Sequence, residues 1–204
     1  KRGYIVIQDC LRTQALKYAF DNSWLPFGQA YFNISSILSR PGRIQEVIKE
    51  IEDFTTNNLG ISLLDIKIKS TKKLKELDDI HKHTSLEVEY DTKDKGDYIW
   101  KYGIPNIHGE GLSISIRNQK TGLYLDVGNI IRFIDDKDNE RGIEFGYGHE
   151  FLLSTITGVQ NPLELSQVFE LFPFSPDLSS KYFGYLEVIA RIKKSKEGIR
   201  VNKS

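Results

Sequence analysis

The chain contains 204 residues, and its 28 basic and 28 acidic side chains give a formal charge of zero at neutral pH. Hydrophobic residues make up 39% and charged residues 27%, which is typical of a globular protein and excludes a disordered chain, a collagen and a disulfide-stabilised scaffold. One cysteine cannot form an internal disulfide, and no apolar run approaches the roughly 18 residues of a membrane helix. We therefore expect a cytoplasmic protein that does not enter a membrane.

Residues 1–83 are predicted to be rich in helices. The clearest element is an amphipathic helix over 41–56, because its apolar residues recur at intervals of three and four. Ser39 is placed to cap this helix, and Pro41 suits its first turn, where a missing N–H costs nothing. The other elements expected in this part are a strand over 4–7, a helix over 10–20, a loop over 24–34 that leads into a strand, a strand over 61–69 and a helix over 71–82.

Residues 84–150 alternate between apolar and polar side chains, the pattern typical of strands. Turns rich in Gly, Asn and Asp, including one at 126–129, separate these strands and predict an antiparallel meander. The longer segment 105–111 contains His108 and two glycines, and we expect a functional loop there. The predicted strands cover 86–90, 98–102, 112–117, 123–127, 130–134 and 143–147.

Residues 151–204 are predicted to form a helix over 161–172 and a strand over 182–192. Asn161 and Pro162 suit the cap and the first turn of that helix. Taken together, the pattern predicts one α+β domain over 1–204. Its antiparallel sheet is expected to be covered on one face by two or three helices, among them those over 41–56 and 161–172.

Three aromatic residues, Tyr98, Trp100 and Tyr102, alternate along one predicted strand and therefore share a face. Burial against a helix is the interpretation we favour. If the face is exposed instead, it forms a platform that binds a protein or a nucleic-acid base.

Two histidines stand close to glutamates: His108 is two residues before Glu110, and His149 directly precedes Glu150. An imidazole beside a carboxylate is the minimum for general base catalysis, although an ordinary polar turn explains the same pattern. His108 and His149 are therefore candidate binding residues for a small ligand.

Asp65, Lys67 and Lys69 occupy alternate positions of a predicted strand and are expected to share its polar face. The spacing of Asp65 and Lys67 resembles the Asp/Glu-x-Lys half of the PD-(D/E)xK nucleases. That resemblance implies Mg²⁺ or Mn²⁺ bound by Asp65 with Asp53 or Glu87, and catalysis by Asp65 and Lys67 on a nucleic acid. A half-buried strand with a solvated face is the simpler explanation.

The sequence contains no phosphate-binding loop, zinc-protease motif or hydrolase nucleophile motif. Our first hypothesis is therefore a non-catalytic interaction or accessory protein, of immunity type, that binds another protein and needs no cofactor. The charge is uneven along the chain: the net charges are +3 over 1–50, −3 over 51–100, −2 over 101–150 and +2 over 151–204. An acidic middle thus lies between basic ends, which favours a basic partner. The alternative hypothesis is the metal-dependent nuclease.

Overall fold

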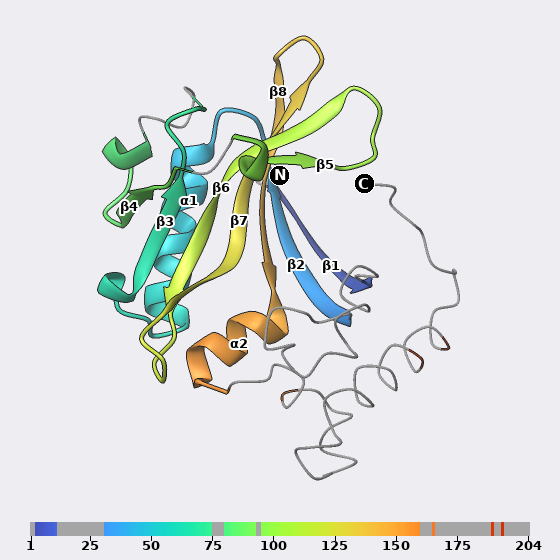
Figure 1. Ribbon diagram of the computed structural model, residues 1–204. Coiled ribbons are helices and arrows are strands. Elements are labelled where there is room, and N and C mark those ends of the chain that lie inside the picture. Colours follow the sequence, from blue (N-terminus) through green and yellow to red (C-terminus); the bar gives the residue numbers. More distant parts are fainter. Residues whose placement is uncertain are drawn as a thin grey trace.

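The computed structural model describes residues 3–11, 31–74, 80–92 and 95–159, with the isolated positions 165, 189 and 193. Within these residues the chain forms one eight-stranded sheet and two α-helices (Figure 1). The sheet has the order β1-β2-β8-β7-β6-β3-β4, and β5 pairs with β6. The elements are β1 (Gly3–Leu11), β2 (Tyr31–Ser39), α1 (Ile44–Asp53), β3 (Ile66–Ser70), β4 (Glu87–Tyr90), β5 (Ile99–Lys101), β6 (Ile107–Arg117), β7 (Tyr124–Asp135), β8 (Glu140–Gly148) and α2 (His149–Thr157).

The centre of the sheet is the predicted antiparallel meander, formed by β6, β7 and β8. The antiparallel pair of β1 and β2 extends it beyond β8, and β3 extends it beyond β6, again antiparallel. β4 runs parallel to β3. The predicted α+β class and the mainly antiparallel sheet are thus confirmed. Among the described residues, no helix is long and apolar enough to cross a membrane.

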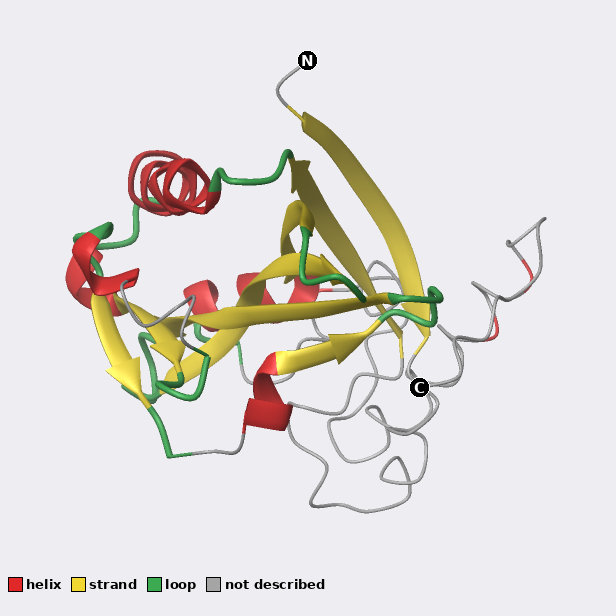
Figure 2. Cartoon of the chain, turned by 90° about the horizontal axis from the view of Figure 1, so that it is seen from above, coloured by secondary structure: helices red, strands yellow, loops and turns green. Residues whose placement is uncertain are grey.

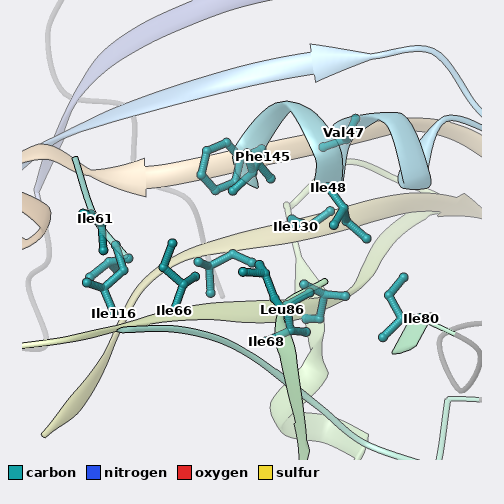
Figure 3. Packing of buried hydrophobic residues seen from close by; sticks show 14 of the residues in the cluster. Val47, Ile48, Ile61, Ile66, Ile68, Ile80, Leu86, Ile116, Ile130 and Phe145 are labelled. Carbon is teal, nitrogen blue, oxygen red and sulfur yellow. The ribbon is translucent and has the colours of Figure 1, made fainter. Parts of the chain in front are cut away.

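One face of the sheet is apolar and packs against α1, which lies on the opposite side of the sheet from β5 (Figure 2). Ile48 of α1 is 1% exposed and lies above Ile130 of β7 (Figure 3). Burying one such isoleucine contributes about 1.5–3 kcal/mol, so this layer holds the helix to the sheet. The remaining core residues on this face include Val47, Ile51, Ile66, Ile68, Leu112, Ile114, Ile116, Ile143 and Phe145.

The start of α1 differs from the prediction. Ser39 ends β2, where it pairs with both Gly3 and Ile143, and does not cap the helix. Pro41 and Gly42 form a turn in which Gly42 has a φ of 75°, and α1 begins only at Ile44. The backbone hydrogen bonds of the sheet therefore take precedence over the local capping signal. The helical backbone continues beyond α1 as a π-helical turn over Phe54–Asn58.

Three predictions about strands were wrong. Cys10 lies in β1 rather than in a helix, and residues 107–111 of the predicted loop over 105–111 belong to β6. The predicted turn at 126–129 is absent, because β7 continues through it as one strand. At Gly128 the backbone of β8 comes so close that a Cβ would lie 2.7 Å from the Gly146 carbonyl oxygen. The glycine therefore permits close strand pairing here and does not mark a turn.

The structure also contains α2 (His149–Thr157), which the sequence patterns did not predict. The predicted helix over 161–172 and strand over 182–192 lie outside the described residues, apart from isolated positions. So do residues 12–20 of the first predicted helix and 75–79 of the third. Leu74 and Ile80, which border that last gap, are buried.

Candidate functional site

The face of the sheet opposite α1 carries small and polar side chains. Successive residues of a strand point to opposite faces of the sheet. In β6, Leu112, Ile114 and Ile116 are buried on the face toward α1, so the residues between them lie on the second face. We call it the polar face. Its members in the three central strands are Gly109, Gly111, Ser113 and Ser115 of β6, Asp126, Asn129, Ile131 and Phe133 of β7, and Gly142, Glu144 and Gly146 of β8, so two apolar side chains stand among the small and polar ones.

A cavity of about 550 Å³ lies over the polar face. Trp100 and Tyr102, at β5, line it together with Asp126, Asn129 and Glu144. Gly146 also lines it: a Cβ there would lie 3.4 Å from Ser36 Oγ and 3.6 Å from Glu144 Oε1. The cavity exists at this point because no side chain projects from residue 146.

Glu144 provides the negative charge of this cavity. Its Oε1 accepts a hydrogen bond from Ser36 Oγ (2.5 Å), and its Oε2 accepts one from the Tyr102 hydroxyl (2.9 Å). Burial, reinforced by the charge of Glu144, raises the pKa of Tyr102 above its ordinary value, so the phenol stays protonated and donates. Both donors are neutral, and no cationic side chain among the described residues pairs with this carboxylate.

The other carboxylate of the cavity, Asp126, is already paired. Its Oδ1 lies 2.9 Å from Lys69 Nζ and accepts a hydrogen bond from Ser115 Oγ (2.5 Å). Lys67, on the same face of β3 as Lys69, lies 2.8 Å from Glu87 and 4.5 Å from the centre of the Tyr124 ring. Of the two described carboxylates that line the cavity, Glu144 is therefore the one without a cationic partner in the part of the chain that the structure describes.

The three predicted aromatic residues have different surroundings, although Trp100 packs against the small buried cluster of Tyr98 and Leu74. Tyr98 ends a 3₁₀ turn over Lys95–Tyr98, is 3% exposed and donates its hydroxyl to Asp91. Burial is the largest cause that raises the pKa of the Tyr98 hydroxyl, and the hydrogen bond to Asp91 is the second. Trp100 and Tyr102 are half-buried and line the cavity, so they are available to contact a ligand whereas Tyr98 packs in the core.

The two histidines lie outside the group of residues that line the cavity. His108, in β6, has its Nε2 3.3 Å from Glu110 Oε1, as their spacing suggested. His149 begins α2, and its Nε2 lies 2.5 Å from Ser35 Oγ. Its neighbour Glu150 instead accepts hydrogen bonds from the backbone and side-chain amides of Asn33, which hold α2 to β2.

Asp65 does not lie in a strand, contrary to the prediction. It ends a 3₁₀ turn over Leu63–Asp65, and β3 begins at the next residue, so Asp65 does not belong to the strand face that holds Lys67 and Lys69. Its carboxylate lies 3.7 Å from Arg117 and accepts a hydrogen bond from Gln119.

The predicted metal ligands Asp53, Asp65 and Glu87 are not gathered into one group. Asp53 ends α1 and accepts a hydrogen bond from Asn57, whereas Glu87 pairs with Lys67. Within the described part of the chain, no three His, Cys, Asp or Glu side chains are arranged to hold a metal ion.

No protein-family model and no curated protein matches this chain. Among solved structures, the chain is similar to apo histidyl-tRNA synthetase from S. aureus, with a TM-score of 0.44 and 16% sequence identity. The match covers 76% of this chain and 44% of that one, so this chain spans less than half of its neighbour. A likeness of this size carries no argument about function.

The sequence patterns missed Glu144, Gly146, Asp126 and Asn129. A usable signal was present, because small residues recur at every second position of β6 and at Gly142, Gly146 and Gly148 of β8. A strand with this spacing leaves one face without bulky side chains. Two such strands, one on each side of β7, leave a hollow on this face of the sheet.

Proposed function

We propose that the protein is a non-catalytic binding protein that receives a cationic group in the cavity on its polar face. The group is a Lys or Arg side chain of a partner protein. The observation that carries the proposal is the carboxylate of Glu144, which lines the cavity and, among the described residues, accepts hydrogen bonds from two neutral donors only. A cytoplasmic location, expected from the single cysteine, belongs to the same proposal.

A bound cation would complete the hydrogen bonding and the charge of this site. A hydrogen bond between an ammonium or guanidinium group and a carboxylate contributes about 1.5–3 kcal/mol, more than a neutral one. The rings of Trp100 and Tyr102 line the same cavity and can contact the cation or its aliphatic stem. Because Ser36 and Tyr102 already hold Glu144 in place, little ordering is needed on binding.

The size of the cavity and the charge of the surrounding chain support the same proposal. About 550 Å³ lies within the usual range of roughly 300–1,000 Å³ for small-ligand sites, and it is ample for a single side chain. The acidic balance of residues 51–150, which supply most of the sheet, favours the approach of a basic partner.

A titration followed by the NMR signals of the tryptophan indoles tests the proposal. The chain contains two tryptophans, and Trp100→Phe assigns the signal of the cavity. Arginine amide should shift the Trp100 signal, whereas citrulline amide, its neutral isostere, should not. An arginine-containing peptide that binds about tenfold more tightly than arginine amide would identify a protein source for the group. Equal shifts with the charged and neutral compounds would contradict the proposal.

The nuclease hypothesis stays a prediction, and no observation among the described residues favours it. Nuclease assays of the wild type and Asp65→Ala with Mg²⁺ or Mn²⁺ decide it. Absence of cleavage by both proteins ends the hypothesis.

A further inference from the structure

Strand β1 forms one edge of the sheet and exposes an apolar surface. It pairs with β2 along nine consecutive residues, and no described strand pairs with its other edge. Tyr4, Ile5, Val6 and Ile7 are 62%, 73%, 39% and 67% exposed. The strand belongs to the sheet but extends beyond the layer that α1 covers (Figure 1).

Edge strands of natural proteins usually carry features that prevent pairing with another chain, such as a charge, a proline or a bulge. Residues 4–8 of β1 contain no Lys, Arg, Asp, Glu or Pro. The pairing register with β2 is unbroken over all nine residues, so no bulge twists the edge away. This edge is therefore suited to adding a further strand.

We infer that β1 pairs antiparallel with β1 of a second copy of this chain, across a two-fold axis at Val6. In that register Ile5 lies opposite Ile7 of the partner subunit, and Tyr4 lies opposite Gln8 of the partner subunit. A two-fold contact of this kind requires a strand that is complementary to itself, and the apolar stretch centred on Val6 meets that condition.

The charges of the strand fit a second copy as well. Asp9 is the single charged residue of Gly3–Leu11, and in this register it lies opposite Gly3 of the partner subunit. Like charges directly opposite each other would oppose self-pairing, and this register places none of them opposite each other within β1. The inference does not depend on what the cavity binds, although Gln8 of β1 is among the residues that line the cavity.

The first test measures the mass of the full chain by sedimentation velocity across a range of concentrations. The wild type is expected to form dimers at micromolar concentration. Ile5→Lys with Ile7→Lys should raise the dissociation constant about tenfold or more, because it places cations in the contact. The matched control is Leu64→Lys, because Leu64 is also apolar and is 85% exposed but lies outside β1. This variant should leave the dimer unchanged.

A cysteine cross-link tests the register. Directly opposed residues of antiparallel strands have Cα atoms about 4.5–5.5 Å apart, within the range that a disulfide spans. In a Cys10→Ser background, Val6→Cys should form a dimer on oxidation. Tyr4→Cys alone should not, but Tyr4→Cys mixed with Gln8→Cys should. A wild type that stays monomeric, a dimer that survives both lysines, or equal cross-linking by Val6→Cys and Tyr4→Cys would overturn the inference.

Discussion

Gly146 shows how one missing side chain creates the candidate site. A Cβ at this position would lie 3.4 Å from Ser36 Oγ and 3.6 Å from Glu144 Oε1, which are ordinary van der Waals contacts. Alanine therefore fits without displacing the backbone. The same substitution at Gly128 would bring a Cβ within 2.7 Å of a carbonyl oxygen of β8. The two glycines therefore have different roles: Gly146 leaves space for a ligand, and Gly128 leaves space for the neighbouring strand.

Gly146→Ala is expected to keep or slightly raise the stability of the protein and to weaken binding of arginine amide. The added methyl group reduces the freedom of the unfolded chain, worth about 0.4–1 kcal/mol, but it occupies the cavity beside Glu144. Urea denaturation and the indole titration measure the two effects. Gly96→Ala, where a Cβ meets nothing within 4 Å, is the control and should leave binding unchanged.

The hairpin between β7 and β8 is held by the side chain of Asp135. Its Oδ1 accepts hydrogen bonds from the backbone amides of Asn139 (2.8 Å) and Lys137 (2.9 Å), and its Oδ2 lies 2.9 Å from Arg141. The hydrogen bond from the Asn139 backbone is the largest of the causes that lower the pKa of Asp135 to about 2. The ionised carboxylate is thus favoured in the folded protein.

This low pKa gives the hairpin a pH dependence of known sign. Because the folded pKa lies below the ordinary value of 3.8, the stabilisation is complete above about pH 4 and is lost as the pH falls toward 2. We expect Asp135→Asn to lower the urea midpoint at pH 7 and to lose this difference between about pH 4 and 2. A difference between the two proteins that is constant down to pH 2 would show that the carboxylate charge is not involved.

Helix α1 is held by its apolar face. Ile48→Ala should lower the free energy of unfolding by about 2–5 kcal/mol, because it opens a cavity between the helix and β7. Lys49→Ala, on the exposed side of the same turn, should change it by no more than about 0.5 kcal/mol. Chemical denaturation measures both, and a similar loss in the two variants would contradict this packing.

The elements that were predicted correctly are those whose pattern of apolar and polar residues lies within the element itself. The spacing of Ile44, Val47, Ile48 and Ile51 is sufficient to identify α1, and strand alternation identifies the meander. The path of β7 through Gly128 was missed because it depends on hydrogen bonds with β6 and β8. Neither of these strands is part of the short sequence that suggested a turn. The candidate site was largely missed for the same reason, since Glu144, Ser36 and Tyr102 meet only after β2, β5 and β8 assemble.

The molecule as a whole has a sheet with two unlike faces. The face toward α1 consists mainly of Ile, Leu and Phe, and the opposite face combines small and polar side chains with aromatic and aliphatic residues around the cavity, among them Trp100, Tyr102 and Ile131. Stability therefore depends on the first face, and the second face can vary with less effect on folding. Of the β1 residues, Gln8 lines the cavity but Ile5 and Ile7 do not, so Ile5→Lys with Ile7→Lys is expected to reduce self-association and to leave ligand binding unchanged.

Electrostatic attraction between the acidic middle of the chain and a cationic ligand should depend on salt. Residues 51–100 and 101–150 carry net charges of −3 and −2. We expect the affinity for an arginine-containing peptide to fall as NaCl is raised from about 0.05 to 0.5 M, because the screening length drops below about 10 Å. Isothermal titration at the two salt concentrations measures this, and an affinity that rises with salt would indicate apolar binding instead.

The most direct test of the account compares the wild type with Glu144→Gln in the arginine amide titration. The substitution keeps the shape of the side chain but removes the charge that the proposal assigns to cation binding. Glu50→Gln, on the exposed side of α1, is the matched control. We predict that Glu144→Gln weakens binding about tenfold or more, while Glu50→Gln binds as the wild type does. Unchanged affinity in Glu144→Gln would contradict the central claim.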